Sequence, residues 1–186
     1  MAIDTSAAGV DPAALPHSSR RDSLRIVEFG PRHIPEAARM HLASYRRAMA
    51  SNPALPAGPL DPRPVESLLR RAAAAGPAVA AIRDGELEGS VAGFPVPRLR
   101  GSGTGVHSPE WAHGVRDGAA GIYETLYSAI SARWARAGQL CHCVSVMTGN
   151  PDLEESLSWS GFGLMVAAAI RTPAAALAAG AAGADR

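Results

Sequence analysis

The chain has 186 residues, of which 47% are hydrophobic and 19% charged, and its formal net charge is +1. This length is enough for one domain with its own core, and the near-neutral charge argues against nucleic acid or an anionic membrane as a partner. No apolar run approaches the roughly 20 residues that cross a bilayer, and the N-terminal segment has no signal-peptide core, so we expect a cytoplasmic protein.

Composition divides the chain into three parts. Residues 1–22 are small, polar and interrupted by proline, and we expect them to form a disordered leader. Residues 172–186 are almost all alanine and glycine, which fits either a fraying helix or a flexible linker. The predicted domain is therefore 23–171.

The first half of this domain begins with a predicted strand over residues 23–29, followed by helices over 34–49 and 64–76 with a proline-rich loop between them. Asp84 and Gly85 then join two apolar runs. This dipeptide predicts a hairpin with a type I′ turn, because both central positions of that turn need a positive φ.

In the second half we predict a strand over 108–115, a loop and helix over 116–138, and a buried strand over 139–148. A short acidic helix starts near Asn150, and a last strand covers 161–171. The predicted order, β-α-α-β-β-β-α-β-α-β, favours an α/β fold with a mixed sheet.

The segment 116–138 begins with small residues and continues as a helix with a broad apolar face. A helix N-terminus has unpaired N–H groups and a partial positive charge, residues 118–121 leave the approach open, and Arg116 adds a full charge. This arrangement suits a pyrophosphate. An ordinary strand-to-helix turn, with small residues for packing, is the simpler interpretation from the residues alone.

With its neighbours, this segment resembles the GNAT superfamily of N-acetyltransferases. In that family a strand leads into a loop of pattern R/Q-x-x-G-x-G/A, which holds the acetyl-CoA pyrophosphate at a helix start. Arg116 and Gly121 match the two ends of this pattern, and Ala119 replaces its middle glycine.

A second family signature is an asparagine at the end of the next strand, with Gly-Phe eleven and twelve residues later. Asn150 has Gly161 and Phe162 at these distances, and Gly89 matches a glycine of an earlier family strand. The resemblance covers about 23–171 and implies an α/β fold whose mixed, mostly antiparallel central sheet is flanked by helices.

The resemblance also implies that acetyl-CoA is the cosubstrate and that a primary amine of a small molecule or peptide attacks its thioester directly. Glu110 is the first candidate for the general base and His113 the second, because both fall on the strand expected beside the thioester. The alternatives are a solvated carboxylate at a strand end for Glu110 and a hydrogen-bonded surface group for His113. The residues expected at the cofactor site are Trp111, Val115, Arg116, Asp117, Gly118, Ala119, Ala120, Gly121, Ile122 and Asn150.

One position departs from the family pattern. Many members have a tyrosine seven residues after the asparagine, which protonates the leaving CoA thiolate; here this position is Leu157, which has no proton to give. Together with Ala119, it motivates an alternative: a non-catalytic GNAT-like domain that binds CoA, or nothing, in a regulatory or scaffold role. A third alternative, a structural interaction protein, predicts no opening between strands 108–115 and 139–148, whereas acetyl-CoA binding needs these strands to diverge.

Around PEWAHGV and GIYETLY the sequence also resembles one half of a tandem pair of GNAT domains, in which the tail 172–186 would be a linker remnant. A homodimer is a second form of assembly that the sequence leaves open. Cys141, His142 and Cys143 alternate faces on a strand and have no second ligand pair, so no metal is expected. The two cysteines are also too close along the chain for an ordinary stabilising disulfide.

Overall fold

The computed structural model describes residues 23–56, 61–101 and 103–169. The predicted leader, 1–22, and the predicted tail, 172–186, lie outside the described residues. Within the described part, none of the helices has the length and apolar character needed to cross a membrane.

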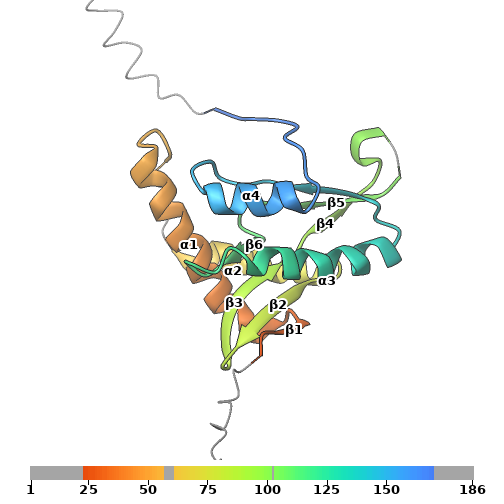
Figure 1. Ribbon diagram of the computed structural model, residues 1–186, viewed down its shortest axis with the longest axis horizontal. Coiled ribbons are helices and arrows are strands. Elements are labelled where there is room, and N and C mark those ends of the chain that lie inside the picture. Colours follow the sequence, from red (N-terminus) through yellow and green to blue (C-terminus); the bar gives the residue numbers. More distant parts are fainter. Residues whose placement is uncertain (1–22, 57–60, 102, 170–186) are drawn as a thin grey trace, which may run out of the picture.

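Two small sheets form the centre of the molecule (Figure 1). The first has the order β1-β2-β3-β6, and all its neighbouring strands are antiparallel. In the second, β5 lies between β4 and β7, antiparallel to β4 and parallel to β7. The strands are β1 Arg25–Glu28, β2 Val79–Arg83, β3 Glu86–Val91, β4 Phe94–Val96, β5 Gly105–Ser108, β6 His113–Val115 and β7 Cys141–Val144. This mixed, mostly antiparallel arrangement confirms the predicted fold class.

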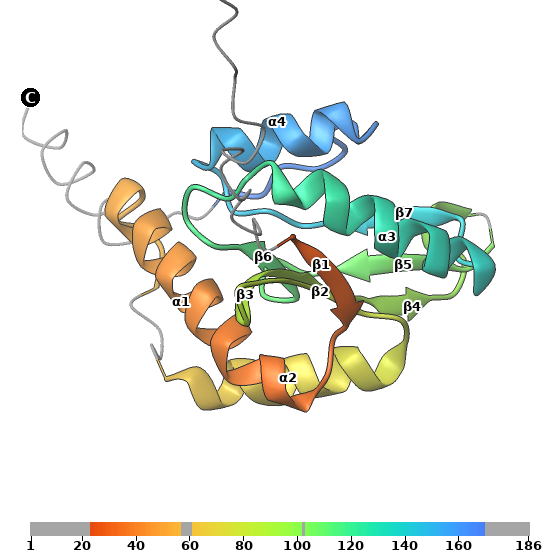
Figure 2. The same ribbon diagram turned by 60° about the horizontal axis from the view of Figure 1, so that its bottom comes forward.

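Helices cover the sheets on two sides, with α1 and α2 on one side and α3 and α4 on the other (Figure 2). Their bounds are α1 Ile34–Ser51, α2 Pro62–Ala75, α3 Ile122–Arg136 and α4 Pro151–Trp159, with short 3-10 turns at Pro31–His33 and Leu99–Gly101. Alternate residues of β2 face the two layers, as the two-residue period of a strand requires. Ala80 packs with the α1 and α2 cluster, and Val79 and Ala81 pack with the α3 and α4 cluster.

The predicted apolar face of α3 forms most of the second cluster. Tyr123, Leu126, Ile130 and Trp134 are almost fully buried there, and the Trp134 indole donates a hydrogen bond of 3.2 Å to the backbone carbonyl of Pro77. The indole therefore fixes this end of α3 against the start of β2.

The predicted hairpin is confirmed. Asp84 and Gly85 have φ values of 54° and 85° between β2 and β3, as a type I′ turn requires. Gly89 of β3 also has a packing reason, because a Cβ there would meet Val115 Cγ1 at 2.8 Å and Leu126 Cδ1 at 2.9 Å. The absence of a side chain lets α3 lie close to the sheet.

The strand predicted over 108–115 is wrong as a single element. Ser108 ends β5 in the second sheet, and His113 begins β6 in the first. Between them the chain turns, with the N–H of Ala112 bonded to the Pro109 carbonyl at 2.8 Å. Proline has no N–H to donate to a ladder, so the strand is interrupted where Pro109 stands.

The other two corrections concern the end of the domain. The strand predicted over 139–148 is shorter, because β7 begins at Cys141 and ends at Val144, which is opposite the last residue of β5. The strand predicted over 161–171 is wrong within the described residues, since 163–169 form no strand and Leu164 is 90% exposed. An apolar run favours a strand, but it needs the edge of another strand as a partner. Residues 170 and 171 lie outside the described part.

Candidate functional site

Two strands diverge at the centre of the molecule. β5 pairs with β7 from Gly105 to Ser108, and a last hydrogen bond of 2.9 Å joins Ser145 N–H to the Ser108 carbonyl. Beyond this point the chain that leaves β5 turns into β6, which pairs with β3. The chain that leaves β7 does not pair with β6. The divergence expected for acetyl-CoA binding is therefore present.

A cavity of about 520 Å³ lies in the opening between the diverging segments. Gly114 and Val115 line it from one side, Val146 and Met147 from the other, and one face of α1 covers it. Residues from both diverging segments thus form its wall.

His113 connects the two segments on either side of this opening. Its Nε2 lies 2.8 Å from the carbonyl oxygen of Ser145, so one side chain of β6 reaches the segment after β7. His107 of β5 reaches the same residue, with its Nε2 2.8 Å from Ser145 Oγ. His113 lines the cavity, whereas neither His107 nor Ser145 does.

The bond to Ser145 also sets the chemistry of the His113 ring. A carbonyl only accepts, so Nε2 must carry the proton, and in the neutral ring Nδ1 keeps a free lone pair. Burial lowers the pKa of His113 and favours this neutral form. Nδ1 is buried and has no hydrogen-bond partner among the described residues. The alternative that His113 is a surface group is therefore wrong, since this residue is only 7% exposed.

Glu110 and His41 lie at the same end of the cavity. Glu110 is exposed and stands in the turn between β5 and β6, not on a strand. His41 comes from α1; burial lowers its pKa, while the charge of Glu110 and a hydrogen bond to the Glu110 backbone oppose that shift. The sequence analysis missed His41, because only the packing of α1 on β6 brings it to this place.

The loop before α3 lies at the opposite end. The N–H groups of Ala119, Ile122 and Tyr123 bond to carbonyls within the turn, whereas those of Gly118, Ala120 and Gly121 have no acceptor in the described residues. Gly121 stands at the helix start and provides no side-chain cap. This leaves neutral N–H donors free at the positive end of the α3 dipole.

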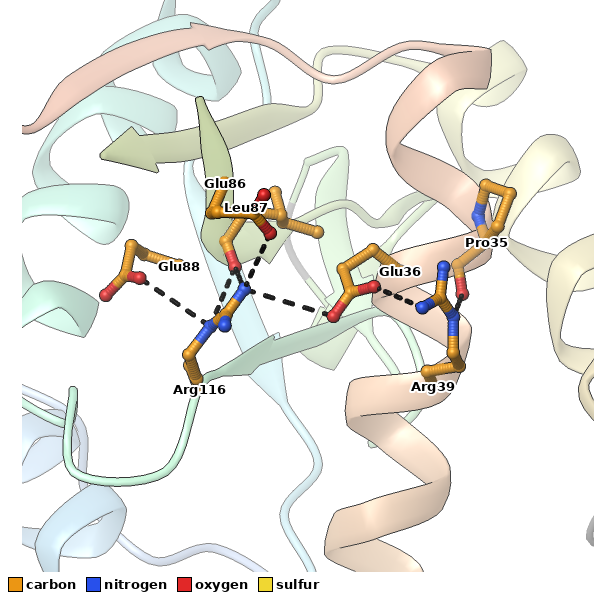
Figure 3. A network of polar contacts seen from close by, with 7 residues as sticks. All are labelled: Pro35, Glu36, Arg39, Glu86, Leu87, Glu88 and Arg116. Atoms are coloured by element: carbon orange, nitrogen blue, oxygen red, sulfur yellow. Dashed lines mark hydrogen bonds and ion pairs between the residues drawn. The ribbon is translucent and has the colours of Figure 1, made fainter. Parts of the chain in front are cut away.

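The Arg116 guanidinium is directed to β3 and α1 instead (Figure 3). Its Nη2 donates to the Leu87 carbonyl at 2.9 Å, and the group lies 3.6 Å from Glu86, 3.6 Å from Glu88 and 3.9 Å from Glu36. Three carboxylates neutralise the charge that the sequence analysis assigned to the pyrophosphate. Arg116 instead holds the loop against β3 and α1.

The other predicted cofactor residues divide into two groups. Those that line the cavity are Val115, Arg116, Asp117, Gly118, Ala120 and Asn150. Trp111, Ala119, Gly121 and Ile122 do not line it. Trp111 packs edge-on against Phe94, at a ring distance of 5.7 Å, and Ile122 is buried in the core under α3.

α4 begins beside the same cavity. The Asn150 side chain accepts a hydrogen bond of 3.2 Å from the N–H of Leu153, which makes it the cap of this helix. Leu157, at the position of the family tyrosine, is buried in the α3 and α4 cluster. The nearby Ser156 hydroxyl is 3.4 Å from the Ala120 carbonyl, so it links α4 to the loop.

A charged contact joins the loop to α1. Arg47 Nη1 lies 2.6 Å from Asp117 Oδ2, and both residues line the cavity. The sequence analysis missed Arg47, which its contact with Asp117 places beside the loop that carries the free N–H groups.

The Cys-His-Cys segment has a structural explanation. His142 bonds to the Tyr127 hydroxyl at 2.9 Å and to the Gln139 carbonyl at 3.0 Å, and both cysteines are free thiols. In the part of the chain that the structure describes, no cluster of three or more His, Cys, Asp or Glu side chains is placed to hold a metal ion.

Neither the protein-family models nor the curated protein sequences compared with the chain match it. Solved structures do match. A ribosomal-protein-alanine N-acetyltransferase from Brucella melitensis biovar Abortus is 20% identical, covers 81% of this chain and 99% of its own, and gives a TM-score of 0.58. A GCN5-related N-acetyltransferase from Ralstonia eutropha is 12% identical, with coverages of 81% and 99% and a TM-score of 0.60.

A predicted acetyltransferase from Clostridium acetobutylicum, solved with acetyl-CoA, is 9% identical, with coverages of 81% and 96% and a TM-score of 0.56. These likenesses show the fold: the chain has the fold of the GNAT superfamily of N-acetyltransferases, as the sequence motifs predicted.

Proposed function

We propose that the chain is an N-acetyltransferase that moves the acetyl group of acetyl-CoA to a primary amine of a small molecule or peptide. The observation that carries this proposal is the cavity between the diverging strands. It has free backbone N–H donors near one end and a neutral imidazole, His113, at the other.

The residues at the loop end fit a pyrophosphate. A Cβ added at Gly118 or Gly121 would meet no atom within 4 Å, so phosphate oxygens have room beside the free N–H groups. Arg47 supplies positive charge there, although Asp117 and Asp152 also line the cavity and oppose it. The N–H groups and Arg47, rather than Arg116, would hold the phosphates.

The reaction balances with the residues at the other end. His113 takes one proton from the incoming ammonium at Nδ1. The free amine then forms a bond to the thioester carbonyl carbon, the C–S bond breaks, and CoA leaves as a thiolate. The second proton lost by the nitrogen goes to this thiolate. Because a thiol has a pKa of about 8.5, its anion is a fair leaving group. The reaction therefore tolerates Leu157 in place of a tyrosine that would donate a proton.

Two observations favour a second candidate, a non-catalytic CoA-binding domain with a regulatory or scaffold role. Leu157 is buried in the core, and the Arg116 charge is engaged by three glutamates. A cytoplasmic location, a homodimer and a tandem partner domain stay predictions under either function.

The first test is calorimetric titration of the full chain with acetyl-CoA. The proposal expects a Kd in the micromolar range, about −8 kcal/mol of binding free energy. No heat would contradict both the enzyme and the CoA-binding domain.

The second test separates those two functions. A panel of amines is incubated with the protein and acetyl-CoA, and acetylated product is measured by mass spectrometry, because Cys141 and Cys143 would react with thiol reagents. The chain contains no lysine, so its own lysine side chains add no background acetylation. For an amine that the protein acetylates, His113→Gln is expected to lower kcat/KM by about a hundredfold or more while acetyl-CoA still binds. Binding without turnover of any amine would favour the non-catalytic domain.

A further inference from the structure

The end of the cavity opposite the loop is built from His41, Glu110 and His113. It is separated from the loop end along α1, because Arg47 follows His41 by six helix positions, a rise of about 9 Å. The two ends therefore have room for different parts of a reaction complex.

The three side chains at this end carry one negative charge, on Glu110, and two imidazole acceptors. Glu110 has no cation within ion-pair distance among the described residues. The two cations that line the cavity are both engaged elsewhere, Arg47 by Asp117 and Arg116 by the β3 backbone and glutamates. An anionic group placed here would meet the Glu110 charge with no free cation to offset it.

Two of these acceptors are also unfilled. Nδ1 of His41 and Nδ1 of His113 are both buried without a hydrogen-bond partner in the described part of the chain. A buried acceptor left without a donor destabilises the folded state. Both residues line the cavity, but neither Nδ1 atom has exposed surface, so a donor in the cavity reaches either atom only after its ring turns.

We propose that this end is the acceptor site and that it selects a cationic alkylamine without a carboxylate or phosphate beside the amine. A primary ammonium carries three N–H donors and one positive charge. Its charge is opposite to that of the unpaired Glu110 carboxylate, and its N–H groups are the kind of donor that the two imidazole nitrogens lack. This inference rests on the proposed acetyl transfer, and it adds the charge class of the substrate.

Three small amines of one carbon skeleton test the selection. Pentylamine carries the ammonium alone, norleucine carries a carboxylate on the carbon that bears the amine, and norleucinamide carries an uncharged amide there. Binding of each to the full chain, without acetyl-CoA, is followed by NMR of the histidine ring signals. Pentylamine and norleucinamide should bind with similar affinity and shift these signals, and norleucine should bind at least about tenfold more weakly.

Glu110→Gln supplies the residue test, with Glu28→Gln as the matched carboxylate control on β1, outside the cavity. Glu110→Gln should weaken pentylamine about fivefold to tenfold and reduce the discrimination against norleucine, and Glu28→Gln should change neither. Norleucine binding as tightly as norleucinamide, an unchanged Glu110→Gln protein, or no shift with any amine would each overturn the inference.

Titration with acetyl-CoA on the same preparation keeps the two proposals apart. Acetyl-CoA binding without amine selection removes this inference alone. Amine selection without acetyl-CoA binding removes the proposed function, and the site remains one for cationic amines.

Discussion

Arg47 of α1 and Asp117 of the loop before α3 form an ion pair of 2.6 Å across 70 positions of sequence. The two side chains are 50% and 70% exposed, so the pair is worth only about 0–1 kcal/mol to the folded state. Its larger effect is on charge, because it places a cation beside the free N–H groups of the loop and partly cancels it with the carboxylate.

Opposite substitutions in this pair should change acetyl-CoA affinity in opposite directions. Arg47→Met removes the cation and should weaken binding about tenfold, and Asp117→Asn frees the cation and should strengthen binding about twofold to fivefold. Both Kd values come from calorimetry. If both variants weaken binding alike, the pair acts by holding the loop in place and not by its charge.

Gly121 follows Ala120, which lines the cavity, and its backbone N–H is a single donor that a substitution can remove. Its φ of −61° suits proline, its N–H has no acceptor in the described residues, and a Cβ there meets nothing within 4 Å. Gly121→Pro should weaken acetyl-CoA about tenfold through the lost donor, whereas Gly121→Ala, which keeps the N–H, should match the wild type. Equal affinities in the two variants would show that this N–H does not contact the ligand.

Arg116 should matter more for stability than for binding. Arg116→Met removes the bonds to Leu87 and leaves Glu36, Glu86 and Glu88 without a shared cation, and we expect the free energy of unfolding in urea to fall by about 1 kcal/mol. The acetyl-CoA Kd should change by less than about threefold, because this charge is already neutralised.

The matched control is Arg70→Met. Arg70 pairs with Glu66 on the exposed face of α2, and its loss should cost less than about 0.5 kcal/mol. A large loss of acetyl-CoA binding in Arg116→Met, with stability unchanged, would restore the role that the sequence motif assigned to this residue.

Acidification should destabilise the protein through its buried histidines. Burial lowers the pKa of His33, His41 and His113 below the usual 6.5 in the folded state. Between the lowered pKa and 6.5 the unfolded chain binds more protons, so the free energy of unfolding rises with pH in this window. This contribution is complete above about 6.5 and is lost as the pH falls below it.

Urea unfolding at a series of pH values from about 5 to 7.5 measures this slope. His113→Gln keeps an N–H donor for the Ser145 carbonyl but does not titrate, so its profile should be flatter than that of the wild type. An identical slope in the variant would assign the pH dependence to other groups.

The local parts of this fold could be read from the sequence because their causes are local. The type I′ hairpin follows from the Asp84-Gly85 dipeptide, and the buried apolar face of α3 follows from the spacing of its apolar residues. Glu110 and His113 were placed at one cavity because they stand three residues apart in a segment that the family pattern assigns to the site.

The parts that could not be read depend on contacts between distant segments. His41 and Arg47 reach the cavity only because α1 packs on β6, and no pattern within α1 shows which side faces a cavity. The Arg116 motif predicted a charge but not its direction, which is set by glutamates on β3 and α1. The last strand was misread because an apolar run contains no information about whether a strand edge is open to it.

Through its bond to the Ser145 carbonyl, the His113 side chain connects the two diverging segments. The width of the opening and the position of the nitrogen that we propose as the base are therefore set by the same ring. If His113 is the base, a change that moves it also changes the width of the cleft, so evolution of this chain toward bulkier acceptors would have to proceed through α1, the wall that this bond does not hold.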